Sequence, residues 1–484
     1  MSEAIEVLNL RRMKSGIFTG IKGQLYVTQK QIAEFVSGEK AMTIVDHVTG
    51  LDITDEIINS ISGKNNRRKE IKNKVTKDDF FHASDDEVQA KILETSKDNT
   101  IDFEFNFVDL FCGAGGLSVG LEKAGMKCIL GTDINTYAMQ SFRHYHSNSE
   151  FFCGPIWSLT EEILKEKIGN KKVHLVCGGP PCQGFSTIGR GESDDQRNQL
   201  FKEFIRIVRT LNPTYILFEN VAGLLAKKNR ETLNAVITSF EALGYRLKIK
   251  VLQAQHYGVP QRRRRTIILG CRDHYYFGFP KPIFDCVENN KYVRPVNLGE
   301  VIDDIYIGNN TTINHNEKIA IPLSEITIER IKHIPEGRGI RYKEDEDELF
   351  PQHLKLDVDW DTIKEGRLRE IRYHRLSKSE PSPTINTGND QYFHPEKNRR
   401  FTVRELARIQ TFPNDFEFFG NYPTQKKLVG NAVPVLMAKA IGNSITQSFR
   451  EKNICNDSEK ISLGKEIANG FHYCEYLEIT NEKI

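Results

Sequence analysis

The chain has 484 residues, which is enough for two or three domains with separate cores. Its 67 lysines and arginines nearly balance its 65 aspartates and glutamates, and the net charge of +2 excludes a globally basic nucleic-acid-binding protein. Nine cysteines without a Cys-x-x-Cys pair argue against a disulfide framework and against a structural zinc site. No apolar run approaches the roughly 20 residues of a membrane helix, and the N-terminus lacks the apolar core of a signal peptide, so we expect a cytoplasmic protein that binds no membrane.

The first hundred residues stand apart from the rest, behind a highly charged segment, Lys64–Asp79, that indicates a linker or an exposed helix. The segments Leu25–Val36 and Val45–Thr54 contain a Tyr-x-Thr strand, a short helix capped at Thr28 and an Asp-x-x-Thr-Gly turn. They resemble the N-terminal DNA-binding domain of polyhydroxyalkanoate-synthesis regulators, which implies a DNA-binding module. A small accessory domain packed on the rest of the chain is the alternative.

From Phe107 onward, short apolar runs alternate with segments of helical periodicity. Strands are predicted at 107–111, 127–132, 173–177, 214–218, 245–252 and 266–270, and helices at 117–123, 136–144 and 231–243 and around 201–208. Such alternation predicts an α/β fold in which helices cover both faces of a parallel sheet. The rhythm is lost between about residues 281 and 390, where we expect loops and acidic runs such as 344–348.

A glycine-rich loop, Gly113-x-Gly115-Gly116, separates the first strand of this series from the first helix. Glycines there allow a tight turn and a close approach of a nucleotide-type cofactor to the backbone. Ser118 stands where an NAD-binding fingerprint requires glycine, so another cofactor of this type is indicated.

Three side chains near this loop are suited to the other parts of such a cofactor. Asp133 ends the second strand, where its carboxylate can accept hydrogen bonds from ribose hydroxyls. Phe111 and Ile134 are placed to sandwich an adenine ring.

A second loop presents a cysteine at the carboxyl end of the strand 173–177, where open α/β sheets place their chemistry. Its sequence from Gly178 to Ser186 is Gly-Gly-Pro-Pro-Cys-Gln-Gly-Phe-Ser. Two prolines fix φ before Cys182, and the glycines on both sides let a ligand approach the backbone. An ordinary buried thiol is the alternative, and the Pro-Pro and Gln-Gly neighbours argue against it.

This cysteine loop resembles the active-site loop of DNA (cytosine-5)-methyltransferases, and five further segments follow in the family's order. These segments are Phe107–Gly116, Glu219–Val221, Gln261–Arg265, Arg404–Gln410 and Gly430–Pro434. The resemblance implies a Rossmann-like, S-adenosylmethionine-dependent methyltransferase sheet, closed by a C-terminal helix over Val435–Ile445. It also implies S-adenosylmethionine as the cofactor, double-stranded DNA as the substrate and no metal ion.

The resemblance also divides the chain into parts and suggests its biological setting. The expected parts are a possibly DNA-binding accessory region with its linker (1–100), the catalytic domain (104–280), an inserted, irregular target-recognition domain (281–400), the segments that complete the catalytic domain (401–450) and a C-terminal tail (451–484). We expect the modification enzyme of a bacterial restriction–modification system, with a cognate endonuclease encoded separately.

Carbon 5 of cytosine is a poor nucleophile, so the chemistry requires covalent catalysis, and the resemblance assigns Cys182 to attack carbon 6. Arg263 and Arg265, at alternate positions entering a strand, would lie on one side; the family's arginines face the flipped base and stabilise its developing charge. Glu219 ends a buried strand beside the cysteine loop, where a carboxyl with a raised pKa can hold a proton for nitrogen 3. A structural ion-pair cluster of Glu219 with the arginine run is the alternative.

The resemblance adds further binding residues. For the cofactor, Asn431 and Ile156 join Phe111, Gly113, Gly115, Gly116, Asp133 and Ile134; for DNA, the candidates are Gln183, Ser186, Thr187 and Arg404, of which Arg404 also anchors the recognition domain. One departure is that Gly154-Pro155-Ile156 stands where the family usually has Gly-Asp-Ile. The carboxylate that would meet the adenine amino group is absent, so we expect weaker or differently arranged adenine contacts.

Other functions fit parts of the sequence. A zinc-dependent cytosine deaminase needs Pro-Cys-x-x-Cys, and Phe185 stands where the second cysteine would be. His144, His146 and Cys153 could be imagined as metal ligands, but two histidines on the exposed face of a predicted helix are usually only that. A catalytically silent DNA-binding regulator and an RNA cytosine-5 methyltransferase remain as alternatives.

Overall fold

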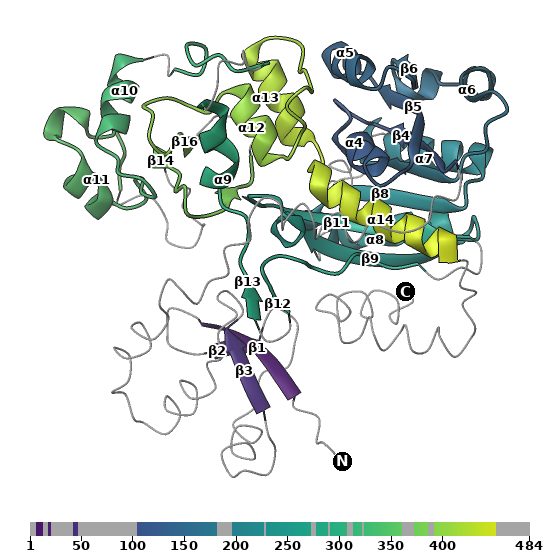
Figure 1. Cartoon of the computed structure of the whole chain (residues 1–484), viewed down its shortest axis with the longest axis horizontal. Helices are drawn as coiled ribbons and strands as arrows, with labels where there is room; N and C mark the ends of the chain where they lie inside the picture. The colour runs from purple at the N-terminus through teal and green to yellow at the C-terminus, as the bar shows by residue number, and fades with distance from the viewer. Residues whose placement is uncertain are drawn as a thin grey trace. The chain divides into compact units, whose positions relative to one another are not determined.

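The computed structural model describes most of the chain from Glu104 to Glu451 and three strands nearer the N-terminus. The described ranges are 6–12, 18–20, 42–46, 104–181, 196–226, 229–272, 277–288, 291–306, 313–321, 324–360, 372–385 and 392–451. The chain divides into two compact units (Figure 1): one contains Met1–Asn99, Asp285–Arg294 and Ile461–Ile484, and the other contains Thr100–Phe284 and Pro295–Lys460.

The first unit contains a three-stranded sheet and a hairpin. Strand β1 (Glu6–Arg12) pairs antiparallel with β2 (Phe18–Gly20) and parallel with β3 (Met42–Asp46). The hairpin joins β12 (Cys286–Glu288) to β13 (Lys291–Val293). Residues 25–36 and 47–54, which carry most of the N-terminal resemblance, lie outside the described residues, so the DNA-binding role of this region stays a prediction.

The second unit is built on a seven-stranded sheet with the order β6-β5-β4-β7-β8-β11-β9. Its strands are β4 (Asn106–Leu110), β5 (Lys127–Asp133), β6 (Glu150–Cys153), β7 (Leu175–Gly178), β8 (Tyr215–Val221), β9 (Arg246–Gln253) and β11 (Arg264–Cys271). The strands from β6 to β8 are parallel, whereas β11 is antiparallel to both β8 and β9. The sheet is therefore mixed, not wholly parallel as predicted, because the short connection from Gln253 to Arg264 holds no crossover helix.

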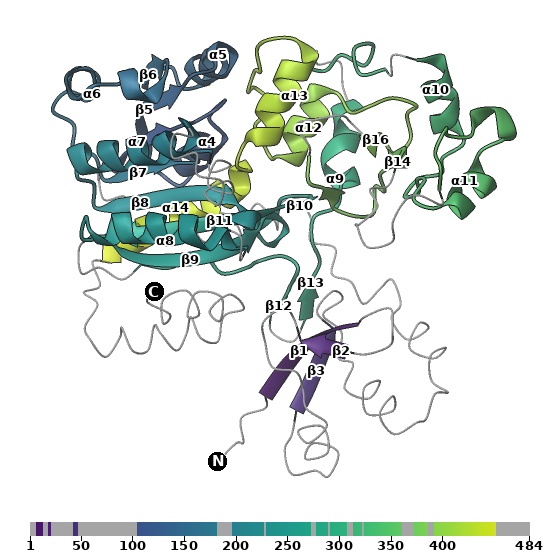
Figure 2. The same ribbon diagram turned by 180° about the vertical axis from the view of Figure 1, so that it is seen from behind.

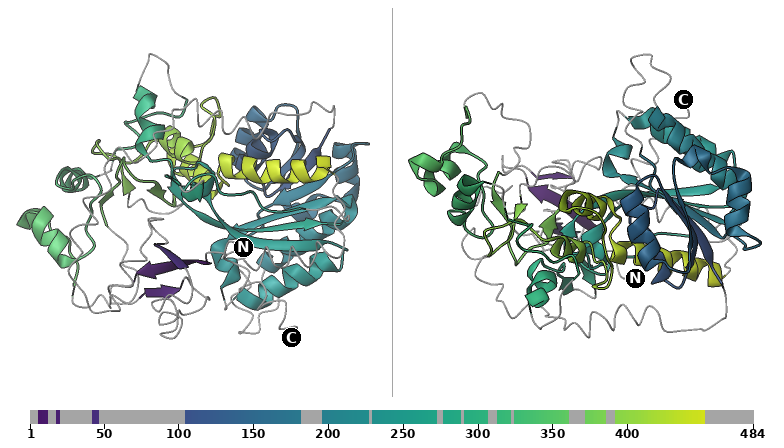
Figure 3. Two further views of the ribbon diagram at one scale, coloured as in Figure 1. Left: turned by 60° about the horizontal axis from the view of Figure 1, so that its bottom comes forward. Right: turned by 90° about the horizontal axis from the view of Figure 1, so that it is seen from above.

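Helices cover both faces of this sheet. They are α4 (Gly116–Glu122), α5 (Thr136–Tyr145), α6 (Glu161–Ile168), α7 (Gln196–Leu211), α8 (Arg230–Glu241) and α14 (Val435–Glu451). Figure 1 shows α14 in front of the sheet and Figure 2 shows α7 and α8 on the opposite side; the left view of Figure 3 has the strands between α14 and α8. Alternation along the strands explains both layers: Leu217 belongs to the core that includes α4 and α14, while its neighbour Phe218 meets Phe204 and Phe240 of α7 and α8.

The stretch Tyr422–Arg450, which contains α13 (Tyr422–Asn431) and all but the last residue of α14, is long and apolar enough to cross a membrane by length and composition. Of its most apolar window, 61% is buried inside the protein. Met437, Ala438 and Ile441 of α14 are fully buried against the sheet and α4, so the hydrophobicity of this helix is that of a core element.

The remaining part of the second unit has short elements joined by loops. Its helices are α9 (Gly299–Ile302), α10 (Glu325–Lys332), α11 (Lys343–Leu349) and α12 (Val403–Ile409), and its strand pairs are β10 (Gln261–Arg262) with β15 (Ser382–Pro383) and β14 (His374–Arg375) with β16 (Tyr392–Phe393). Polar groups organise much of it. The buried guanidinium of Arg375 donates to the carbonyls of Ile331, Ile334 and His394 and to Asn398.

The acidic run at residues 344–348 lies on the helix α11. The Asp345 carboxylate accepts from the backbone N–H of Tyr342 at 2.9 Å and so caps the helix start. Glu346 is buried, and its carboxylate accepts from Nε1 of Trp360 at 2.8 Å. These bonds offset the repulsion between neighbouring carboxylates.

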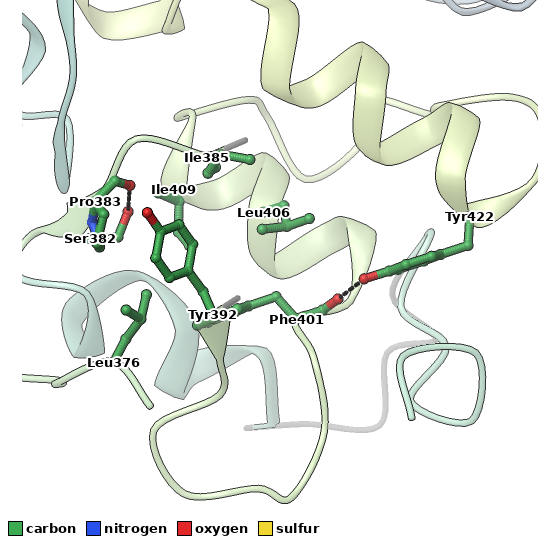
Figure 4. Close-up of a pocket in the computed structure, with 9 residues that line it drawn as sticks. All are labelled: Leu376, Ser382, Pro383, Ile385, Tyr392, Phe401, Leu406, Ile409 and Tyr422. Carbon is green, nitrogen blue, oxygen red and sulfur yellow. Dashed lines mark hydrogen bonds between the residues drawn. The ribbon is translucent and has the colours of Figure 1, made fainter. Parts of the chain in front are cut away.

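A small cavity of about 10 Å³ lies between the short strands β15 and β16 and the helices α12 and α13 (Figure 4). Its walls are formed by Leu376, Ser382, Pro383, Ile385, Tyr392, Phe401, Leu406, Ile409 and Tyr422. The hydroxyl of Tyr422 donates to the carbonyl of Phe401, and that of Ser382 to the carbonyl of Pro383. The space is about that of one water molecule, so we regard it as a packing feature and not as a ligand site.

Candidate active site

Glu219 lies at the start of the cysteine loop. Strands β7 and β8 pair Gly178 with Phe218, which brings the next residue of β8 beside the first residues of the loop. A Cβ atom on Gly179 would lie 2.6 Å from Oε2 of Glu219, so only glycine leaves room for this carboxyl group. Next to it, Nδ2 of Asn220 donates to the carbonyl of Pro180 at 3.0 Å and fixes the loop two residues before Cys182.

Asn220 therefore joins two of the recognised segments, a role that the sequence analysis did not assign to it. Cys182, Gln183, Ser186 and Thr187 lie outside the described residues, and their roles stay predictions.

Glu219 and Arg265 form a largely buried ion pair. Nε of Arg265 lies 2.8 Å from Oε1 of Glu219, and the two side chains are 14% and 13% exposed, respectively. The antiparallel register explains the contact, because β11 pairs Ile267 with Glu219 and thus carries Arg265 past it on the same face. Burial raises the pKa of the Glu219 carboxyl, while Arg265 and Arg263 oppose the rise.

Arg263 occupies a different place from the one predicted. Its side chain is 1% exposed, and its guanidinium donates to the carbonyls of Gly430 at 2.8 Å and Ala432 at 3.0 Å. The prediction that it faces the base beside Arg265 is therefore corrected: Arg263 lies near enough to influence Glu219 electrostatically, but its hydrogen bonds go to the C-terminal segment.

The glycine loop and the end of β5 form a second polar centre. The carboxylate of Asp133 accepts from the backbone N–H of Gly113 at 2.9 Å and of Asn135 at 2.8 Å. Phe111, with φ of 59°, and Gly113, with φ of 57°, both lie in the left-handed region, so the chain turns sharply here. The carboxylate retains lone pairs for further donors, as ribose binding requires.

The three glycines of this loop have different reasons for being glycine. A Cβ on Gly113 would point into open space, which is compatible with a ligand lying there. A Cβ on Gly115 would lie 2.8 Å from Nε2 of His146, and one on Gly116 would lie 2.7 Å from the carbonyl oxygen of Val433. Gly115 and Gly116 are thus required by packing within the protein.

The apolar side chains predicted to hold adenine differ in exposure. Ile134 is 66% exposed and Phe111 is partly buried, whereas Ile156 is only 5% exposed. The next residue, Trp157, is 53% exposed on the same short 3-10 helix, Ile156–Ser158. No signal in the sequence pointed to Trp157, because packing decides which side of a three-residue turn faces solvent.

That turn is held by α7, the helix after the cysteine loop. The guanidinium of Arg206 donates to the carbonyls of Leu159 at 2.8 Å and Ile156 at 3.2 Å. At its other end, the backbone N–H of Gly154 donates to the carbonyl of Asp133 at 3.0 Å. The segment that departs from the family pattern at Pro155 is thus fixed to both neighbouring elements.

Asn431 is the last residue of α13 and is exposed. The segment after it contacts the glycine loop through the carbonyl of Val433 beside Gly116. The structure thus brings the first and the last of the recognised segments together beside the loop that follows β4.

Arg404 is corrected as a DNA contact. It is fully buried, and its guanidinium donates to the carbonyls of Ile313 and Pro413, at 2.9 and 2.8 Å, and to that of Phe416. A buried guanidinium with these bonds is inaccessible to a phosphate, and its anchoring role accounts for the residue. Arg408, four residues further along the same helix, pairs with Asp304 and donates to Asn414.

The described part of the chain contains no group of three His, Cys, Asp or Glu side chains that could hold a metal ion. His146 does not lie on an exposed helix face as expected. Its side chain is fully buried, with Nδ1 2.8 Å from Oε2 of Glu122.

Comparison with known proteins decides the family. The model of the C-5 cytosine-specific DNA methylases matches residues 105–447. The chain belongs to this family. It is a DNA (cytosine-5)-methyltransferase, and the methyl donor of the family is S-adenosylmethionine.

Among its relatives, the type II methyltransferase M1.HphI of Haemophilus parahaemolyticus is 35% identical over 345 residues, which cover 70% of this chain and 86% of the relative. The type II methyltransferase M.DdeI of Desulfomicrobium norvegicum is 28% identical, over 76% of this chain and 94% of its own. The crystal structure of a prophage-encoded DNA modification methyltransferase of E. coli superposes with a TM-score of 0.53 at 25% identity, over 72% of this chain and all of that one.

These comparisons confirm the predicted fold class and the predicted enzyme family. They give no support to the resemblance proposed for the first hundred residues, because the family match begins at residue 105.

Proposed function

We propose that this methyltransferase modifies carbon 5 of a flipped-out cytosine within a specific sequence of double-stranded DNA, through a covalent bond to Cys182. The observation that carries the proposal is the buried Glu219–Arg265 pair at 2.8 Å, with Glu219 against Gly179 at the start of the cysteine loop. A buried carboxyl group with a raised pKa and a cation are thus fixed beside Gly179, the residue three positions before the nucleophile.

The residues at the glycine loop fit S-adenosylmethionine. Asp133 has acceptor capacity for the ribose hydroxyls, Gly113 leaves open space beside it, and Ile134 offers an exposed apolar surface to the adenine. When bound, the cofactor supplies an electrophilic methyl group.

In the proposed mechanism, the Cys182 thiolate adds to carbon 6 of the cytosine, and the ring electrons move toward nitrogen 3. Glu219, whose pKa is raised by burial, holds the proton that nitrogen 3 receives, and Arg265 fixes the orientation of this carboxyl. Carbon 5 thereby becomes nucleophilic enough to accept the methyl group. Loss of the proton from carbon 5 and β-elimination then release the thiol and restore the aromatic ring.

The target carbon is inaccessible inside a duplex, so the base has to be rotated out at a cost of a few kcal/mol. We propose Gln183, Ser186 and Thr187 as contacts to the DNA around the flipped base. Residues 281–400 are proposed as the target-recognition domain. This domain is inserted between the two parts of the catalytic domain, 104–280 and 401–450. We further propose that the enzyme is the modification partner of a separately encoded restriction endonuclease in the bacterial cytoplasm, which the names of its type II relatives support.

Bisulfite sequencing of DNA from cells that express the protein tests the activity and the target site together. We expect one short sequence to be methylated at carbon 5 of one cytosine. The same DNA should then resist an endonuclease that cuts this sequence. Methyl transfer by the purified protein to transfer RNA but not to any DNA would contradict the proposal and favour the RNA alternative.

A further inference from the structure

We propose that Arg263 is a positioning residue that clamps the segment Gly430–Val433, which contains the predicted cofactor residue Asn431, to the start of β11. Its loss should therefore weaken cofactor binding more than it slows methyl transfer. This inference rests on the proposed function, because it concerns the cofactor of that reaction. It assigns different tasks to two arginines of one run: Arg265 serves the base pocket and Arg263 serves the cofactor pocket.

The hydrogen bonds of Arg263 fall on both sides of a predicted cofactor residue. The two carbonyls that accept from its guanidinium belong to Gly430 and Ala432, which flank Asn431 in the chain. Asn431 itself is exposed, so the clamp holds the backbone and leaves this amide accessible to a ligand. A charged donor bound to two carbonyls is stronger than a neutral one and fixes the direction of the peptide planes.

The same segment, Gly430–Val433, also packs against the glycine loop. A Cβ atom on Gly116 would lie 2.7 Å from the carbonyl oxygen of Val433, so the two backbones are in close contact. A shift of the segment by a fraction of an ångström would therefore move both Asn431 and the loop that begins α4.

Two buried glutamines reinforce this junction. Nε2 of Gln261 donates to Oε1 of Gln410 at 3.0 Å, and Nε2 of Gln410 donates to the carbonyls of Val429 at 2.8 Å and Ala432 at 3.3 Å. Both glutamines are fully buried. Arg263 and Gln410 thus share one acceptor, the carbonyl of Ala432, and hold it from two directions.

The glutamine pair also reaches the proposed recognition domain. Oε1 of Gln261 accepts from the backbone N–H of Ile385 at 3.2 Å, and β10 pairs Gln261 with Ser382. Gln261 directly precedes the arginine run, and Arg263 lies two residues beyond it. Parts that are distant in sequence, 261–265, 382–385 and 429–433, therefore meet around one buried hydrogen-bonded group.

Burying the charged guanidinium of Arg263 costs desolvation free energy, which argues that this arginine has a function. Burial lowers the pKa of Arg263 to about 9, with Arg265 acting in the same direction and Glu219 against it. A methionine of similar length would avoid this desolvation, so a buried arginine here serves the orientation of its acceptors.

The test is isothermal titration of the full-length protein with S-adenosylmethionine in the absence of DNA. For Arg263→Met we expect the Kd to rise by about tenfold or more, as the loss of charge-assisted hydrogen bonds predicts. Arg263→Lys should give a smaller rise in Kd, with a higher KM for the cofactor and a kcat near that of wild type at saturation.

Matched variants separate the two tasks of the arginine run. Arg264→Gln removes an exposed charge from the same run and should leave cofactor binding unchanged. Arg265→Lys should also keep cofactor binding, but it should slow formation of the covalent adduct with a duplex that carries 5-fluorocytosine at the target. Gln410→Met should weaken cofactor binding in the same direction as Arg263→Lys, and the double variant should show less than the sum of the two effects.

Wild-type cofactor affinity in folded Arg263→Met, together with slow adduct formation, would overturn the inference and return Arg263 to the base pocket. Circular dichroism and the thermal midpoint establish folding. If Arg263→Met does not fold, Arg263→Lys and Gln410→Met decide, and unchanged Kd values in both contradict the clamp. A wild-type protein that binds the cofactor but methylates no DNA would refute the proposed function and leave the clamp to be judged by the same titrations.

Discussion

The pH dependence of stability should contain a large contribution from one buried carboxyl, Asp109. It lies on β4, two residues before Phe111, and is 1% exposed. The hydroxyl of Ser118, on α4, donates to its Oδ2 at 2.6 Å, so the carboxyl ties the first helix to the sheet. Burial raises its pKa to about 7 from the ordinary aspartate value of 3.8, against the effect of the Ser118 hydrogen bond.

The sign follows from proton binding. Between pH 3.8 and about 7, the folded state holds the proton on Asp109 while the unfolded state has released it. The contribution of Asp109 to the free energy of unfolding is therefore present at low pH, and it is lost as the pH rises from 3.8 to about 7. Between pH 5 and pH 8 the loss is on the order of 3 kcal/mol for this single group.

The assay compares thermal midpoints of wild type and Asp109→Asn from pH 5 to pH 8. Asparagine keeps an acceptor for Ser118 and cannot ionise, so the variant should lose this part of the pH dependence. The thermal midpoint of the variant should rise relative to that of the wild type by several degrees toward pH 8. Other titrating groups affect both proteins equally, and parallel profiles would refute the reasoning.

Four further predictions concern the site and the recognition region. Cys182→Ala should abolish methyl transfer and the adduct with 5-fluorocytosine DNA while retaining DNA binding; methylation above background by the purified variant would contradict this. Glu219→Gln should slow single-turnover transfer by about a hundred- to ten-thousandfold with cofactor binding intact, and an unchanged rate would show a purely structural role. Arg375→Met leaves the buried carbonyls of Ile334, His394 and Pro395 without their donor and should destabilise the protein by about 3 kcal/mol or more, measured by thermal unfolding against the exposed-residue control Arg372→Met. Removal of the residues before Phe105 should keep the target sequence but weaken binding to all DNA and flatten its salt dependence; identical affinity and salt slope would refute the DNA-binding role of that region.

The sequence by itself determined most of the elements and the enzyme family. Apolar runs located six of the seven strands of the main sheet to within a few residues, because burial on both faces demands continuous hydrophobicity. The edge strand β6, whose residues are exposed or half-buried, was not predicted. The segments around Gly113, Glu219 and Asn431 could be recognised because each requires particular residue types at fixed spacing. The raised pKa of Glu219 was also predictable, since the carboxyl follows a buried strand.

Only the tertiary structure decided which partner each polar side chain meets. Nothing in a run of four arginines distinguishes Arg263, bound to the carbonyls of Gly430 and Ala432, from Arg265, paired with Glu219. Arg404 likewise reads as a surface cation until its carbonyl partners are known. Local pattern fixes the side on which a residue of a regular element lies, but hydrogen-bond partners more than a hundred residues away are set by how the elements pack. That packing also left Trp157 exposed.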